Sequence, residues 1–209
     1  MSDDYQTSYD AVAEEYAARI FDELQHKPLD RELLDRFAAR VRGAGTACDL
    51  GCGPGQVARY LQTQGVDVCG YDLSPKMVEL AGQLTPSIEF HQGDMCSLDV
   101  ADQSWEGIAS FYSIIHIAPE LMSQTLKELW RVLRPSGLLL MSFHIGSETL
   151  HLDEWWGKKV ILDFFFLDPT TLASQLRDAG FEVEEIIERE PYPEVEHQSR
   201  RAYIFARRP

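Results

Sequence analysis

The chain has 209 residues, of which 44% are hydrophobic and 25% are charged, and its 34 acidic and 19 basic side chains give a net charge of −15. This acidity argues against a nucleic-acid partner, because binding to phosphate depends on Lys and Arg. No apolar run approaches the roughly 20 residues of a membrane span, the polar N-terminus shows no signal peptide, and the four cysteines match no common zinc pattern. We therefore expect a single cytoplasmic domain over residues 1–209, with no nucleic-acid, membrane or metal partner.

The first part of the chain is predicted to be helical. Apolar residues recur at helical spacing from Tyr9 onward and again after Pro28, and Gly43 ends the unit. We expect residues 1–43 to form a helical arm that covers one side of a sheet. Tyr9 and Tyr16 are the side chains that this arm could carry into a ligand pocket, although packing in the core explains them as well.

A glycine-rich stretch follows the first predicted strand. Residues 49–55 read Asp-Leu-Gly-Cys-Gly-Pro-Gly and are followed by a helical pattern. Three alternating glycines let the backbone pass close to a ligand, and the start of the next helix offers unpaired N–H groups. Asp49 stands at the end of the strand. The pattern predicts a turn that binds a small polar ligand with a cationic part.

Two further strands are also predicted to end in acidic residues. The second strand, 66–72, ends at Asp72, which in doubly wound folds is the position that accepts hydrogen bonds from ribose hydroxyls. The third, 88–91, leads to Gly-Asp-Met, where Asp94 could accept a hydrogen bond from an amine such as that of adenine and Met95 could pack on the base. A surface turn is the competing interpretation of either acid.

Strands and helices continue to alternate toward the C-terminus. Strands are predicted at 107–113 and 138–143, with a helix from Pro119 between them, and two final strands at 181–188 and 201–206. This alternation is typical of a parallel sheet with right-handed crossovers.

The segment 145–167 interrupts this alternation and is rich in aromatic residues. An insertion after the fifth strand lies over the carboxyl edge of the sheet, where ligands bind in open α/β folds. We therefore expect a substrate lid here, with His151 and Trp156 as contacts. Some of its aromatic residues must instead pack on the core, because the three consecutive Phe164 to Phe166 cannot all face one side.

Four motifs in this order resemble the S-adenosylmethionine-dependent methyltransferases of the seven-stranded, Rossmann-like class. They are Asp49-Leu50-Gly51-Cys52-Gly53-Pro54-Gly55, Tyr71-Asp72-Leu73-Ser74-Pro75-Lys76-Met77, Gly93-Asp94-Met95 and Leu133-Arg134-Pro135-Ser136-Gly137-Leu138. The resemblance implies an α/β three-layer sandwich with a mostly parallel seven-stranded sheet, an antiparallel last strand and an N-terminal helical cover.

A nicotinamide-dependent oxidoreductase is the nearest alternative, since Asp72 would also suit the ribose of NAD. The dinucleotide fingerprint requires a glycine three residues after its second glycine. That position is Gln56, and the third glycine comes earlier, at Gly55. The glycine motif therefore favours the methyltransferases.

The resemblance places the cofactor at the ends of the first three strands. Asp49 would face the methionine ammonium group, Asp72 would hold both ribose hydroxyls, and Asp94 would accept from the adenine amine. The implied cofactor contacts are Tyr16, Asp49, Gly51, Cys52, Gly53, Asp72, Leu73, Met77, Asp94, Met95 and Phe111.

The acceptor side is predicted from aromatic and histidine side chains. A neutral nucleophile must lose a proton, and histidine is the usual acceptor near neutral pH. His116, after the fourth strand, is the candidate base or positioning residue, although packing explains it equally well and many relatives of this fold use no protein base. The candidate acceptor contacts are Tyr9, Tyr112, His144, His151 and Trp156.

The expected activity is methyl transfer from S-adenosylmethionine to a small-molecule acceptor, with S-adenosylhomocysteine as product, by a monomer or homodimer. The Asn/Asp-Pro-Pro-Tyr signature of amino-group methylation on nucleic acid or protein glutamine is missing, and Phe111-Tyr112-Ser113-Ile114 stands in its place. A cofactor-binding module without methyl transfer, acting as a regulatory or partner subunit, remains the alternative from a different class.

Overall fold

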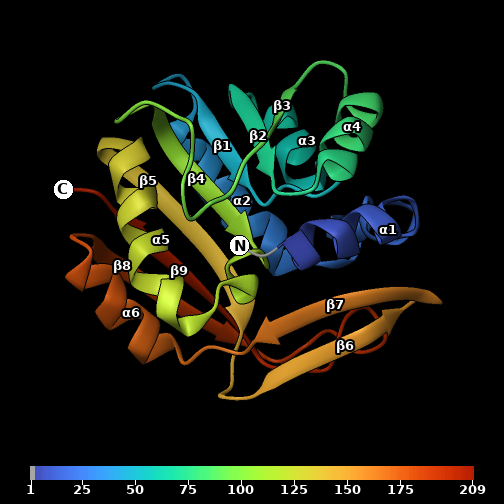
Figure 1. The fold of residues 1–209 in the computed structure, drawn as a ribbon. Helices are drawn as coiled ribbons and strands as arrows, with labels where there is room; N and C mark the ends of the chain where they lie inside the picture. Colours follow the sequence, from blue (N-terminus) through green and yellow to red (C-terminus); the bar gives the residue numbers. More distant parts are fainter. Residues whose placement is uncertain (1–2) are drawn as a thin grey trace.

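The computed structural model describes residues 3–209, which form one seven-stranded sheet, a separate two-stranded hairpin and the helices around them (Figure 1). The strands are β1 (Ala47–Leu50), β2 (Val68–Asp72), β3 (Glu89–Gln92), β4 (Trp105–Phe111), β5 (Leu133–His144), β6 (Thr149–Trp155), β7 (Lys158–Phe165), β8 (Glu182–Arg189) and β9 (Arg201–Arg207). The helices are α1 (Asp3–Ile20), η1 (Glu23–His26), α2 (Pro28–Val41), α3 (Gln56–Thr63), α4 (Pro75–Leu84), η2 (Ile114–His116), α5 (Pro119–Val132) and α6 (Pro169–Asp178).

The order of strands in the large sheet is β3-β2-β1-β4-β5-β9-β8. The first five of these strands pair in parallel, and β9 is antiparallel to both of its neighbours. The predicted mostly parallel seven-stranded sheet with an antiparallel last strand is confirmed. The strand order reverses between β1 and β4, and ligands bind at such a switch point in open α/β sheets.

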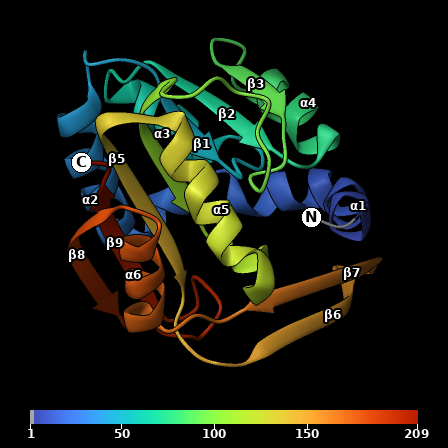
Figure 2. The same ribbon diagram turned by 60° about the vertical axis from the view of Figure 1, so that its left-hand side comes forward.

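Helices cover both faces of the sheet, which confirms the three-layer arrangement. In β5, Leu138 and Leu140 pack with α2 and α3 on one face. Leu139 and Met141, which alternate with them, pack with α5 and α6 on the other (Figure 2). A strand that is buried on both faces is typically rich in consecutive apolar residues, and residues 138–141 supply such a run.

Most predicted strand boundaries shift by one or two residues, and the changes at the fourth and fifth strands affect the local backbone. The fourth strand ends at Phe111, and Tyr112 then takes a φ of 51°, which turns the chain toward η2. β5 begins at Leu133, and the predicted turn at 135–137 is an irregularity within the β4–β5 pairing, where Trp105 pairs with Leu133 and Gly107 with Leu138.

The aromatic segment forms the antiparallel β6–β7 hairpin, which extends away from the large sheet (Figure 1). Helix α1 lies between this hairpin and α4. Its side chains bond to the backbone of β7: Ser8 Oγ accepts from Ile161 N at 2.8 Å, and Tyr5 Oη donates to Asp163 O at 3.4 Å. The predicted helical arm therefore lies against the hairpin through α1 and against the sheet through α2; residues 1 and 2 of the arm lie outside the described part.

Within residues 3–209, none of the helices combines the length and the apolar character that crossing a membrane requires.

Candidate active site

The glycine turn between β1 and α3 depends on backbone conformations that favour glycine. Gly51, Gly53 and Gly55 have φ angles of 74°, 52° and 87°. Gly51 N donates to Tyr71 O at 2.7 Å, which ties the turn to the end of β2. A Cβ at Gly51 would lie 2.2 Å from Ser113 Cβ. The first glycine is therefore required by the packing of the turn itself.

Asp72, at the end of β2, holds this turn in place. Its Oδ2 accepts from Gly53 N at 2.8 Å and its Oδ1 from Ser74 N at 2.9 Å. Burial raises the pKa of the carboxyl above its usual value, against the lowering effect of these backbone donors. Each oxygen of a carboxylate has a second lone pair, so Asp72 can bond to a ligand as well as to the turn.

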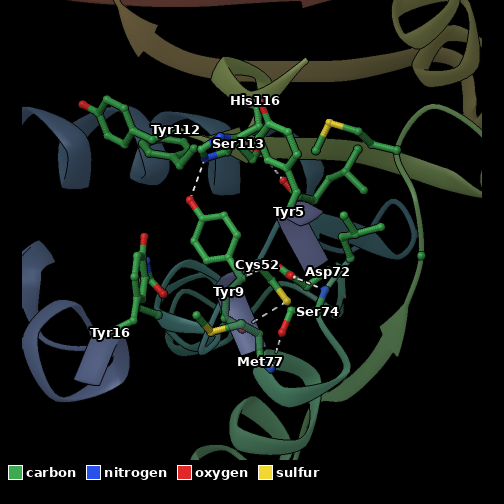
Figure 3. Close-up of a pocket in the computed structure, with 18 residues that line it drawn as sticks. Tyr5, Tyr9, Tyr16, Cys52, Asp72, Ser74, Met77, Tyr112, Ser113 and His116 are labelled. Carbon is green, nitrogen blue, oxygen red and sulfur yellow. Dashed lines mark hydrogen bonds between the residues drawn. The ribbon is translucent and has the colours of Figure 1, made fainter. Parts of the chain in front are cut away.

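A first cavity opens between the glycine turn, α1 and the loops after β2, β3 and β4 (Figure 3). Nine of the eleven predicted cofactor contacts line it: Tyr16, Gly51, Cys52, Gly53, Asp72, Leu73, Met77, Met95 and Phe111.

The other two predicted cofactor contacts lie beside this cavity, and its described lining does not include them. Asp49 is buried beneath the turn, where its Oδ2 accepts from Ala58 N at 2.8 Å. Burial raises the pKa of this carboxyl to about 7. Asp94 Oδ1 accepts from Cys96 N at 2.9 Å, and its neighbours Gly93 and Met95 are the ones that line the cavity.

A second cavity adjoins the first. The residues that line both are Tyr9, Tyr16, Gln56, Phe111 and Tyr112. Its remaining walls come largely from the hairpin, the end of β5 and the loop before β9, and they include Ile115, His144, Leu150, Leu152, Trp155, Phe164, Phe166 and His197. The glycine turn lines only the first cavity, and the second combines aromatic walls with the charged side chains Glu23, Lys27, Glu154, Glu196 and Arg201.

Three of the five predicted acceptor contacts line the second cavity, namely Tyr9, Tyr112 and His144. His151 is exposed on β6, where its Nδ1 lies 2.7 Å from Asp163 Oδ1. Trp156, at the hairpin turn, stacks on Trp155 with ring centroids 4.4 Å apart, and Trp155 is the one that lines the cavity.

His116 lines the first cavity and is bonded through both ring nitrogens. Nδ1 lies 3.0 Å from Asp163 O, and Nε2 lies 2.6 Å from Tyr9 Oη. A carbonyl oxygen only accepts, so Nδ1 carries the proton. Burial lowers the pKa of His116 to about 4, which keeps the ring neutral near pH 7. Nε2 is therefore an acceptor, and Tyr9 donates to it.

Comparison with known proteins identifies the family. Residues 47–137 match the family model described as a methyltransferase domain. The chain is 30% identical over 165 residues to a 2-phytyl-1,4-naphtoquinone methyltransferase from Thermosynechococcus vestitus, covering 66% of this chain and 72% of that protein. The chain belongs to the S-adenosylmethionine-dependent methyltransferases.

Other similar proteins also have methyltransferase names. The chain is 28% identical to a malonyl-[acyl-carrier protein] O-methyltransferase from Enterobacter lignolyticus over 63% of this chain and 53% of that protein, so the chain spans about half the length of this relative. A solved S-adenosylmethionine-dependent methyltransferase from Methanosarcina mazei shares the fold, with a TM-score of 0.70, 19% identity and coverage of 78% of this chain and 92% of that one.

The residues of the first cavity fit the cofactor of this family. An acid that can reach two ribose hydroxyls, methionine side chains that can pack on adenine and a glycine turn with close backbone approach are all present in one cavity. Aromatic rings from α1 and β4 complete it, and such rings suit a weakly hydrated sulfonium cation.

Gln56 lines the site, although its position in the sequence was interpreted only as evidence against the dinucleotide fingerprint. It is the first residue of α3 and lines both cavities. Its Nε2 lies 3.4 Å from Glu23 Oε1, which orients the amide, because the reverse orientation would place two acceptor oxygens together. Its buried Oε1 has no hydrogen-bond partner among the described residues. Its position directly after the third glycine of the turn was the sequence feature that could have predicted its place in the site.

Proposed function

We propose that the chain transfers a methyl group from S-adenosylmethionine, bound in the first cavity, to a small-molecule acceptor bound in the second. The observation that carries this proposal is the shared boundary of the two cavities, since a methyl group that passes from donor to acceptor must cross it. The names of the relatives, a quinone methyltransferase and a malonyl-[acyl-carrier protein] O-methyltransferase, support an acceptor other than nucleic acid.

The residues of the first cavity have distinct roles in this proposal. Asp72 binds the ribose hydroxyls, while Leu73, Met77 and Met95 enclose the adenine. Asp94, beside the cavity, accepts from the adenine amine. When bound, the cofactor supplies an electrophilic methyl group on a sulfonium. The protein aligns the acceptor atom with that methyl, and effective molarities of up to about 10⁵–10⁸ M are the scale of gain from such alignment.

Calorimetric titration with S-adenosylhomocysteine, followed by a screen for its formation from S-adenosylmethionine over a panel of acceptors, tests the proposal. We expect micromolar or tighter binding and turnover of at least one acceptor. Tight binding without turnover of any acceptor would favour the regulatory module instead. Absence of binding, or binding of NAD in its place, would refute the cofactor assignment.

We expect Gln56→Leu to weaken S-adenosylhomocysteine binding about 10-fold or more. The unpartnered Gln56 Oε1 is proposed to accept from the methionine ammonium group, and a hydrogen bond to a charged group contributes about 1.5–3 kcal/mol. Calorimetry measures the change. The control ligand is 5′-methylthioadenosine, which keeps the nucleoside but lacks the amino acid and should bind to Gln56→Leu as it does to wild type. An equal loss for both ligands would contradict the assignment.

A further inference from the structure

Tyr9 lies on the boundary between the two cavities and carries a hydroxyl that bonds to a histidine of the first. The residue lies on α1 and lines both cavities, and its Oη donates to His116 Nε2 at 2.6 Å (Figure 3). His116 in turn donates from Nδ1 to Asp163 O at 3.0 Å. The two bonds form one chain of hydrogen bonds, in which Tyr9 donates to His116 and His116 donates to the backbone of β7.

The surrounding rings hold this chain in one geometry. His116 is only 7% exposed, and its ring packs edge-on against Tyr5, Tyr9 and Phe164 with centroid distances of 5.6, 5.3 and 4.7 Å. Tyr9 also meets the rings of Tyr16 and Trp155 edge-on. A fixed geometry of this kind is what a proton transfer during the chemical step needs.

Five charged side chains line the second cavity, and four of them, Glu23, Lys27, Glu196 and Arg201, are paired with one another, while the fifth is the carboxylate Glu154. Lys27 Nζ lies 2.6 Å from Glu23 Oε2 and 3.6 Å from Glu196 Oε2. Arg201 Nε lies 3.1 Å from the same Glu196 oxygen. An anionic acceptor would have to compete with these pairs and would face the Glu154 carboxylate, whereas a neutral one can lie against the aromatic walls and leave the pairs intact. The cavity therefore favours an uncharged, largely aromatic acceptor over an anionic one.

A neutral acceptor must lose a proton when its oxygen is methylated, and the Tyr9–His116 chain begins at the boundary that the methyl group crosses. We propose that the second cavity takes a neutral aromatic hydroxyl compound and that Tyr9 relays its proton to His116. This inference rests on the proposed function and adds to it an acceptor class and a route for the proton.

The proposed step is balanced in atoms and charge. The acceptor oxygen forms a bond to the methyl carbon as the carbon–sulfur bond breaks, and that electron pair stays on sulfur. The acceptor proton moves to Tyr9 Oη while the Tyr9 proton moves to His116 Nε2, so Tyr9 ends neutral and His116 becomes an imidazolium. One positive charge is present before and after the step, and it moves from the sulfonium to the His116 imidazolium. The Asp163 carbonyl accepts from the imidazolium.

The test uses two acceptors of different acidity, 1-naphthol and 4-nitrophenol, with the latter assayed at a pH where it is already ionised. We expect Tyr9→Phe to lower kcat for 1-naphthol about 100-fold or more, in the range of general-base effects, with little change in KM. The variant should retain nearly full activity on ionised 4-nitrophenol, which has no proton to relay. His116→Gln should show the same pattern, and the double variant should lose no more than either single one, because the two residues act as a unit.

Three controls separate this inference from the proposed function. Tyr60→Phe, which removes a hydroxyl bonded to Asp35 outside both cavities, should leave both rates unchanged. S-adenosylhomocysteine should bind to Tyr9→Phe within about threefold of wild type; lack of binding to the wild type would refute the proposed function itself. Nitrogen-15 NMR of the protein without ligands should show His116 Nε2 unprotonated at pH 7.

Several outcomes would overturn the relay while leaving the proposed function standing. Equal losses on both acceptors would make Tyr9 a positioning residue. A protonated Nε2 at pH 7 would leave no acceptor for the Tyr9 proton. The acceptor class would be refuted if 1-naphthoate or an amine were methylated while neither hydroxyl probe was. It would also be refuted if the cofactor bound and neither hydroxyl probe was methylated.

Discussion

Gly51→Ala is expected to lower the melting temperature by roughly 5–15 °C, since about 1 kcal/mol corresponds to roughly 2–4 °C in a chain of this size. The added Cβ would lie 2.2 Å from Ser113 Cβ and 2.8 Å from Ser113 Oγ, at a φ of +74° that alanine tolerates poorly. Forced packing of this kind costs about 1–3 kcal/mol, and backbone strain adds about 1–3 kcal/mol. Thermal unfolding followed by circular dichroism measures the change.

Ser113 cannot move aside without losing further bonds. Its Oγ donates to Leu50 O at 2.7 Å and lies 2.7 Å from Ser110 Oγ, and both bonds are buried. A displaced Ser113 would break its buried hydrogen bond to the carbonyl at the end of β1, and a typical hydrogen bond contributes about 0.5–1.5 kcal/mol. The variant that does fold should therefore bind S-adenosylhomocysteine weakly, because the turn is displaced.

Gly43→Ala is the matched control for this prediction. Gly43 has a φ of +77°, close to that of Gly51, but an added Cβ there would meet no atom of residues 3–209 within 4 Å. It carries the cost of the backbone conformation without the clash, so its melting temperature should fall much less and its ligand affinity should stay unchanged. Equal effects of the two variants would show that φ alone, rather than the contact with Ser113, makes Gly51 necessary.

The elements of the large sheet could be predicted because their signals are local. An apolar run, a glycine turn and a helix start lie within about ten residues of each other in the β1–α3 unit. The largely apolar residues 138–143 predict that β5 is buried on both faces. The positions of Asp72 and Met95 in the cavity follow from strand ends in the same way.

The hairpin was harder to predict because its turn lacks the usual residues. Its two-residue connection, Trp156-Gly157, has φ angles of 51° and 77°. Tight hairpin turns with two positive φ angles favour Asn-Gly or Asp-Gly. Because a tryptophan stands at the first position, the sequence does not predict a hairpin turn there. Trp156 therefore forms part of the turn and stacks on Trp155, and it is Trp155 that lines the cavity.

The bond between Tyr9 and His116 could not be predicted from spacing, because it joins residues 107 positions apart. It exists only because α1 lies along β7, where Val12 packs with Val160 and Leu162 and where hydrogen bonds join side chains of α1 to the backbone of β7. Neither contact follows from a local pattern in the sequence. Asp49 shows the same limitation at short range. Its acidic character was visible, but its bond to Ala58 N beneath the turn depends on how α3 packs.

Asp72→Ala is expected to weaken S-adenosylhomocysteine binding about 100-fold or more. Two bonds from ribose hydroxyls to a carboxylate are lost, each worth about 1.5–3 kcal/mol when the partner is charged, and 1.4 kcal/mol is tenfold in affinity. Gly53 N and Ser74 N also lose their acceptor, so the turn itself is disturbed. Calorimetry and thermal unfolding should therefore both change.

Asp67→Ala is the control for charge, because Asp67 lies just before the other end of β2 and its carboxylate accepts from Thr46 Oγ1 at 2.7 Å, away from both cavities. It removes one negative charge and should leave affinity unchanged. Asp72→Asn keeps the shape and one acceptor oxygen but turns an amide toward one of the two backbone donors. The affinity of Asp72→Asn for S-adenosylhomocysteine should lie between those of the wild type and Asp72→Ala. Wild-type affinity in Asp72→Ala would refute the ribose assignment.

The ligand 5′-methylthioadenosine distinguishes the two ends of the proposed cofactor site. It keeps the ribose and lacks the amino acid, so Asp72→Ala should lose affinity for it by the same factor as for S-adenosylhomocysteine. Gln56→Leu should lose affinity only for S-adenosylhomocysteine. Suppose instead that Asp72→Ala loses affinity only for S-adenosylhomocysteine and Gln56→Leu loses affinity for both ligands. The cofactor would then lie along the glycine turn in the reverse direction, and Tyr9 would not be near its methyl group.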